Sequence, residues 1–173
     1  MTDQRSIADE FLTDSIELLQ QSMVKIRACL NQLTEQQIRW RPHPDSNHIA
    51  NLILHICGNL RQWSVSGVGG LPDTRDRDAE FAQQIDLDKQ QLMQHATDAI
   101  QQCEAFLATV TPEQLLADYQ IQGFQVSGLQ ALNHTITHFV GHTHQIIYIT
   151  RQILGSDYQF VWSPDQGRDQ LPI

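Results

Sequence analysis

The stretch "ALNHTITHFVGHTHQIIYITRQILG", residues 131–155, has the composition and residue spacing of one long amphipathic helix. Its apolar side chains recur at helical spacing, which places them on one face. Gly155 fits the residue that follows a helix C-terminus. We therefore predict a helix from about 127 to 154, with an apolar seam formed by Leu132, Ile136, Phe139, Ile146 and Ile153.

Three further segments, at about 7–34, 47–66 and 87–109, have the same amphipathic pattern. Four such helices in a chain of 173 residues indicate an all-α fold, a four-helix bundle, because each apolar seam has to be buried against another helix. We expect residues 1–173 to form a single domain with an irregular C-terminal tail from about 156. The clearest seam, in the first helix, alternates steps of four and three through Leu12, Ile16, Leu19, Met23, Ile26, Leu30 and Leu33.

The connections carry weaker signals. Asp45, Ser46 or Asn47 is expected to cap the second helix. "DYQIQGFQV", residues 118–126, alternates polar and apolar residues, but we expect an extended connection there because the chain offers no second strand for pairing. The acidic run "DTRDRDAE", residues 73–80, is expected to be a solvated loop.

The charge balance excludes several classes of partner. The chain has 20 acidic and 11 basic residues and a formal net charge of −9, which argues against binding to nucleic acids or to anionic membranes. The first residues, "MTDQRSIADEF", lack the apolar segment of a signal peptide, and no apolar run reaches the length of a transmembrane helix. The three cysteines form no CxxC pair, so we expect reduced thiols in a cytoplasmic protein.

The histidines are sorted by the helices that carry them. At about 100° per residue, the fourth helix places a polar stripe beside its apolar seam. This stripe consists of His134, His138, His142 and Gln145. The second helix also has a polar stripe, formed by His48, Asn51, His55, Asn59 and Gln62. If the two stripes face each other, three imidazoles converge.

Converging imidazoles have two interpretations. Neutral imidazole is a good ligand for Zn²⁺ and Ni²⁺, and two histidines four residues apart on a helix can bind one ion. The alternative is a set of histidines with ordinary hydrogen bonds at the surface or in the core. His134 is the weaker member of its stripe, because it lies a turn further along. His48, at a helix start, is expected to cap the helix or to contact solvent. His43 and His95 are expected in a loop and at the surface, and His144 in solvent or at an interface.

Two segments, "NHIANLILHICGNLRQW" (47–63) and "HFVGHTHQIIYITRQILG" (138–155), resemble the DinB-like (DinB/YfiT) superfamily, and in particular its DUF1572-type branch. The resemblance implies a four-helix bundle, often a homodimer, with a divalent metal at one end. Carried over to this sequence, the implied metal ligands are His55, His138 and His142. The chain departs from the HxGQ pattern common in the family, because His144 replaces the glycine before Gln145.

The resemblance also implies a function. Characterised relatives of the superfamily include metal-dependent thiol transferases, so our first hypothesis is an enzyme that binds a small thiol and presents its thiolate to an electrophile. A second hypothesis is a non-catalytic, stress-associated dimeric bundle that binds metal. A third is metal-assisted hydrolysis, which requires a carboxylate base near the ion, and neither polar stripe supplies an Asp or Glu. Zinc and nickel suit three histidines about equally.

Overall fold

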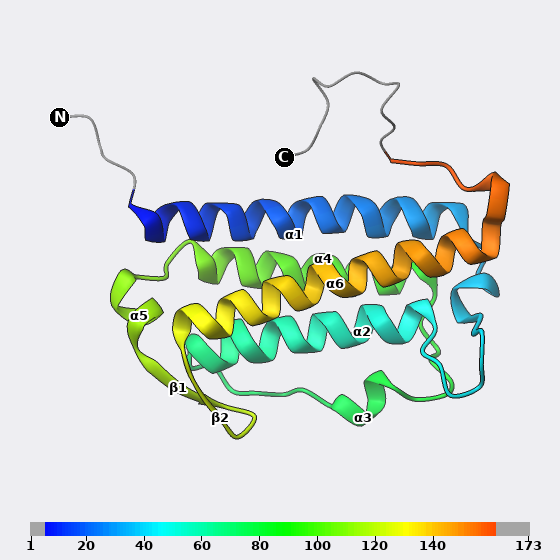
Figure 1. The fold of residues 1–173 in the computed structure, drawn as a ribbon. Helices are drawn as coiled ribbons and strands as arrows, with labels where there is room; N and C mark the ends of the chain where they lie inside the picture. Colours follow the sequence, from blue (N-terminus) through cyan, green and yellow to red (C-terminus); the bar gives the residue numbers. More distant parts are fainter. Residues whose placement is uncertain (1–5, 162–173) are drawn as a thin grey trace, which may run out of the picture.

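The computed structural model describes residues 6–161 as a mostly helical chain, in which four long helices lie side by side (Figure 1). They are α1 (Ile7–Gln32), α2 (Ile49–Leu60), α4 (Lys89–Leu107) and α6 (Gly128–Leu154). Their bounds agree with the four predicted helices to within a few residues, except that a π-helical segment, η2 (Arg61–Val68), continues α2. The irregular tail expected from about 156 is described only as far as residue 161.

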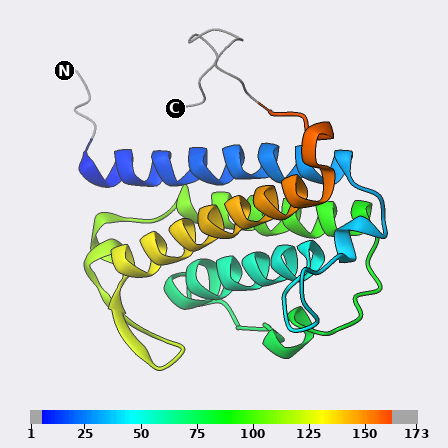
Figure 2. The same cartoon turned by 45° about the vertical axis from the view of Figure 1, so that its right-hand side comes forward.

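The chain direction of these helices follows from the connections between them. The colours of Figure 1 show α1 and α6 running in one direction and α2 and α4 in the other. The segment 69–88, which includes the short helix α3 (Arg77–Glu80), crosses the length of α2 to reach the start of α4. Figure 2 shows the same order from another side. As a result, α2 packs against both α4 and α6, and α3 packs against α2.

The helix starts are fixed by capping interactions. Ser6 and Asp9 form a capping box on α1. The predicted cap of α2 is wrong: His48 holds this position, and its Nδ1 accepts a hydrogen bond of 3.0 Å from the backbone N–H of Asn51. Of the two roles expected for His48, capping or contact with solvent, the first is confirmed, and the residue is buried at 1% exposure. Thr111 caps the short helix α5 (Pro112–Leu116), with the proline at its first position.

The predicted extended connection is a β-hairpin. Strand β1 (Asp118–Ile121) pairs with β2 (Phe124–Ser127) in antiparallel register, so the segment supplies both strands itself. The two turn residues, Gln122 and Gly123, have φ of 52° and 83°. Positive φ at both positions is what a tight two-residue hairpin loop requires.

The core is formed by the apolar seams of the four long helices. It contains fully buried side chains from each of them, for example Leu19, Ile53, Leu92 and Phe139. All three cysteines are buried free thiols. In the described part of the chain, no helix is both long and apolar enough to cross a membrane. What matters for function is that the packing of α2 against α6 brings their polar stripes together.

Candidate metal centre

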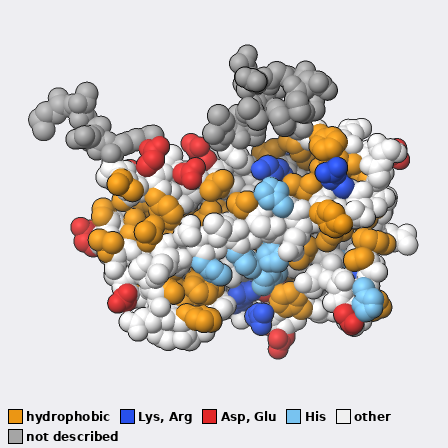
Figure 3. Space-filling view, in the orientation of Figure 1, with side chains coloured by type: hydrophobic (Ala, Val, Ile, Leu, Met, Phe, Trp, Pro, Cys, Tyr) orange, Lys and Arg blue, Asp and Glu red, His pale blue; other side chains and the backbone are white. Residues whose placement is uncertain are grey.

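The three predicted ligands converge between α2 and α6. Figure 3 shows histidine side chains gathered on this face of the molecule. His55 Nε2 lies 3.3 Å from His138 Nε2, and His142 Nε2 lies 3.2 Å from the same atom. The candidate ligand atoms of all three residues lie within 4.8 Å of one another. His55 is buried, and the two histidines of α6 are half-buried.

The outer nitrogens of two of these rings are hydrogen-bonded. His55 Nδ1 lies 3.0 Å from Oε2 of Glu80, and His142 Nδ1 lies 2.8 Å from Oε1 of Gln145. A carboxylate and an amide oxygen are acceptors, so each Nδ1 carries the proton that it donates. In the neutral ring the proton-free Nε2 then presents its lone pair to the centre of the cluster. This is the arrangement in which histidine binds metal ions.

The Nε2 contacts of His138 cannot both be hydrogen bonds. A neutral imidazole has one N–H, and His55 and His142 use theirs on Glu80 and Gln145. A proton on His138 Nε2 can form a hydrogen bond with Nε2 of only one neighbour, His55 or His142. The Nε2 lone pair of the other neighbour then has no hydrogen-bond donor. A proton on His138 Nδ1 instead leaves three proton-free Nε2 atoms facing one another, with their lone pairs opposed. A cation between the three nitrogens would satisfy all of them.

The rings of His138 and His142 are held in the neutral form that metal binding requires. Burial, together with the neighbouring His142, His55, His134 and Arg75, lowers the pKa of His138 to about 3. Burial also lowers the pKa of His142, against the opposing effect of its hydrogen bond with Gln145. The imidazoles of His138 and His142 are therefore uncharged at neutral pH, and each has one proton-free nitrogen available as a ligand.

Two of the three nitrogen–nitrogen spacings also fit a tetrahedral ion, and the third pair of candidate ligand atoms lies within 4.8 Å. Two nitrogens that each lie about 2.0–2.1 Å from a zinc ion at tetrahedral angles are about 3.3 Å apart. The two short nitrogen–nitrogen distances, 3.3 Å and 3.2 Å, agree with this value. Three protein ligands leave further coordination positions open, as in catalytic metal sites.

Glu80 is a residue of the centre that the sequence analysis missed. It was assigned to a solvated acidic loop, but it is only 6% exposed. Arg75 holds both carboxylate oxygens, from Nε to Oε1 and from Nη2 to Oε2, each at 2.7 Å. Burial raises the pKa of Glu80, but the hydrogen bonds from Arg75 and His55 outweigh this effect and lower it. Glu80 therefore stays ionised and acts as an anchored acceptor for the His55 ring.

Gly58 makes room for this carboxylate. A Cβ at this position of α2 would lie 1.9 Å from Oε1 of Glu80 and 3.0 Å from Nε of Arg75. Such a contact is impossible, so a side chain here would displace the pair that supports His55. The sequence shows this glycine one turn after His55 on the same helix, but it does not show that Glu80 and Arg75 lie against it.

The amide side chains of the two polar stripes have different roles. Gln145 orients His142, as its place on the polar stripe suggested. Asn59 lies on the stripe of α2, but its Oδ1 accepts a hydrogen bond of 2.9 Å from the Thr135 hydroxyl and not from an imidazole. Asn51 also turns away from the cluster, since its Nδ2 donates to the backbone carbonyl of Glu80 at 2.8 Å and so helps to fix the 73–80 segment.

The other histidines lie outside the cluster. His134 stacks on Trp63 at a ring-centroid distance of 4.3 Å and is exposed. His144 is exposed and His43 lies in an exposed loop, as predicted. His95 was predicted at the surface, but it is half-buried on α4 and lines a cavity with Arg61.

This chain is similar to one protein family and, in fold, to a solved structure. The sequence model of the family described as "Protein of unknown function (DUF1572)" matches residues 6–167. No curated protein of assigned function matches this chain. A solved structure from Enterococcus faecalis, described as the crystal structure of the conserved protein of locus, superposes with a TM-score of 0.71. The two chains are 20% identical, and the alignment covers 83% of this chain and 97% of the other, so it shows similarity of fold alone.

Proposed function

The chain belongs to the DUF1572 family, whose function is unknown, and we propose that it is a divalent-metal-binding protein whose ion is held by His55, His138 and His142. The observation that carries this proposal is the contact of three Nε2 atoms that cannot be satisfied by protons alone. The donor set of neutral imidazoles suits Zn²⁺ and Ni²⁺.

The proposal extends to the type of fold. We infer a four-helix bundle of the DinB-like type, with the metal site between its second and last long helices. Support comes from the direction of the four helices and from the position of the three histidines on two of them. The two segments that carried the sequence resemblance contribute all three proposed ligands.

For the reaction, we propose a thiol S-transferase that acts on small electrophiles. A bound divalent ion supplies Lewis-acid chemistry at the open positions and lowers the pKa of a coordinated thiol. The chain's own residues hold and orient the imidazoles: Glu80 keeps the proton on Nδ1 of His55, and Gln145 keeps it on Nδ1 of His142. Arg75 fixes Glu80 through two hydrogen bonds.

Hydrolysis is a weaker candidate even though a carboxylate lies beside the cluster. Both oxygens of Glu80 accept hydrogen bonds from Arg75, and one also accepts from His55. A general base needs a free lone pair directed at the attacking water. Glu80 therefore supports a ligand and does not activate a nucleophile.

Elemental analysis of the purified protein tests the metal proposal. We expect one divalent ion per chain in the wild type and substantially less in His55→Ala and His138→Ala. His134→Ala is the matched control, because this ring lies on the same helix but outside the cluster. Wild-type protein that binds neither Zn²⁺ nor Ni²⁺ on titration would overturn the proposal.

A separate assay tests the reaction. The metal-loaded protein is incubated with low-molecular-weight thiols and chlorinated or epoxide electrophiles, and loss of the thiol is measured. Turnover in the wild type that disappears in His138→Ala supports the transferase. Metal binding without turnover across these thiols would favour a non-catalytic metal-binding protein.

A further inference from the structure

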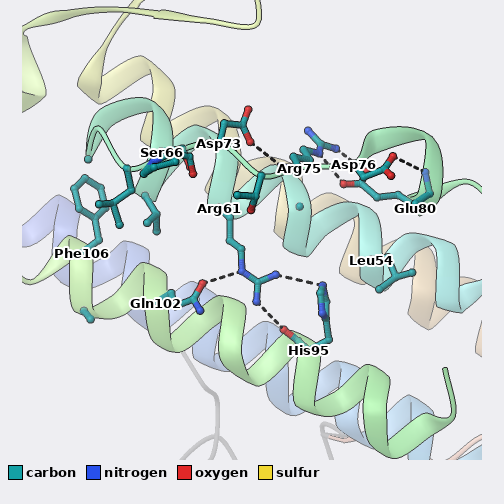
Figure 4. Close-up of a pocket in the computed structure, with 18 residues that line it drawn as sticks. Leu54, Arg61, Ser66, Asp73, Arg75, Asp76, Glu80, His95, Gln102 and Phe106 are labelled. Carbon is teal, nitrogen blue, oxygen red and sulfur yellow. Dashed lines mark hydrogen bonds and ion pairs between the residues drawn. The ribbon is translucent and has the colours of Figure 1, made fainter.

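A large cavity lies between α2, η2, the 71–80 segment and α4 (Figure 4). Its volume is about 1180 Å³, somewhat above the usual range for small-molecule sites. Much of its wall is apolar and comes from Leu54, Val65, Leu71, Ala105 and Phe106. None of the three clustered histidines lines this cavity, although Gly58, Arg75 and Glu80, which support His55, form part of its wall.

Arg61 is the feature that gives this cavity a chemical preference. Its side chain spans from α2 towards α4, where Nε donates to Oε1 of Gln102 at 2.8 Å (Figure 4). Nη1 lies 3.2 Å from Nε2 of His95, and Nη2 donates to the His95 carbonyl at 3.5 Å. These are all neutral partners, since burial and the charge of Arg61 lower the pKa of His95. Within residues 6–161, no carboxylate pairs with the half-buried Arg61.

The guanidinium also has donors to spare. Of its five N–H groups, three are used by Gln102 and His95. One N–H on each terminal nitrogen has no partner in the described part of the chain. Each of these two N–H groups can donate a charge-assisted hydrogen bond to a carboxylate oxygen.

The acidic residues of the cavity are already engaged, and they limit the charge of a ligand. Asp73 accepts hydrogen bonds from Gln62 and from the backbone of Arg75. Asp76 caps α3, and Glu80 is paired with Arg75. Asp73 and Asp76 are exposed, so water screens them, but they would repel a ligand with several negative charges.

We propose that this cavity binds a small amphipathic monocarboxylate, with its carboxylate on Arg61 and its apolar body against the Leu54, Val65, Leu71 and Phe106 walls. The unpaired cation selects the anionic head, and the apolar lining accommodates the rest of the molecule. This site is independent of the proposed metal function, so either proposal can fail without the other.

Calorimetric titration of the full chain with decanoate, and with 1-decanol as its uncharged counterpart, tests the proposal. The wild type should bind one decanoate per chain, and Arg61→Gln should weaken this binding at least tenfold while leaving the affinity for decanol unchanged. His138→Ala should bind decanoate as the wild type does, which separates this cavity from carboxylate coordination at the metal centre.

A second pair of variants tests the location. Ala105→Trp fills the cavity and should abolish binding of both probes, whereas Ala108→Trp, on an exposed position outside the lining, should not. Melting temperatures of all variants confirm that they fold. No binding of decanoate to the wild type, equal affinity in Arg61→Gln, or unchanged binding in folded Ala105→Trp would each overturn the proposal.

Discussion

Gly58→Ala tests the support that the 73–80 segment gives to the metal centre. In the middle of a helix, alanine is normally more stable than glycine by about 0.5–1 kcal/mol. Here the added Cβ would lie 1.9 Å from Oε1 of Glu80, and ordinary contact begins at 3.4 Å, so the oxygen has to retreat by about 1.5 Å. The hydrogen bond of 3.0 Å between Glu80 and His55 does not survive a displacement of this size.

Two effects follow from this displacement. Overpacking of a filled site typically costs about 1–3 kcal/mol, so we expect the free energy of unfolding to fall where a helix-propensity argument predicts a rise. Loss of the acceptor for Nδ1 of His55 should weaken metal binding by about 10–100-fold, or about 1.4–2.8 kcal/mol. Urea unfolding measures the first effect, and competition with a chromophoric chelator measures the second.

Gly141→Ala is the matched control. Gly141 lies on α6 directly before His142, and a Cβ there would meet nothing within 4 Å. This variant should gain about 0.5–1 kcal/mol and keep its metal affinity. If Gly58→Ala is as stable as Gly141→Ala and binds metal as tightly as the wild type, the role assigned to the Glu80–His55 contact is refuted.

Three further predictions concern the same structure. Removal of the metal by a chelator should lower the melting temperature by roughly 5–11 °C, because free metal at 100 times Kd adds about 2.7 kcal/mol to the free energy of unfolding. An unchanged melting curve measured by calorimetry would contradict this prediction. The metal-free protein should lose stability as the pH falls below about 6.5, because burial lowers the pKa of His48 to about 4 and that of His138 to about 3. The histidines of the unfolded chain then take up protons at a higher pH than those of the folded protein. Urea unfolding at several pH values should show a smaller loss of stability for His48→Asn, which keeps a capping side chain. Gln145→Ala should weaken metal binding less than Gly58→Ala, because Gln145 is exposed and water can replace its oxygen at Nδ1 of His142. A lower metal affinity in Gln145→Ala than in Gly58→Ala, measured by chelator competition, would contradict this prediction.

The sequence predicted the elements that depend on regular periodicity. The apolar seams located all four long helices, and the two polar stripes contain the three histidines that the structure brings together. These predictions succeed because residues three or four apart lie on the same face of a helix, whatever surrounds the helix. The hairpin at Asp118–Ser127 was missed because the alternating segment was treated as a single strand without a partner, whereas the turn at Gln122 and Gly123 divides it into two strands that pair with each other.

The part of the site that could not be predicted comes from an irregular segment. Glu80 and Arg75 belong to an acidic run whose composition is that of a solvated loop, and only the path of the chain across α2 buries them. The cap of α2 failed for a related reason: His48 is an uncommon capping residue, and three more usual ones precede it. No local pattern encodes such long-range contacts.

The most direct test of the metal centre is a crystal structure of the metal-loaded protein with an anomalous signal collected at the absorption edge of the bound metal. The account predicts one ion coordinated by the Nε2 atoms of His55, His138 and His142, at about 2.0–2.1 Å for zinc, with Nδ1 of His55 still bonded to Glu80. An ion bound elsewhere, or coordination through His134 in place of one of these three, would contradict it.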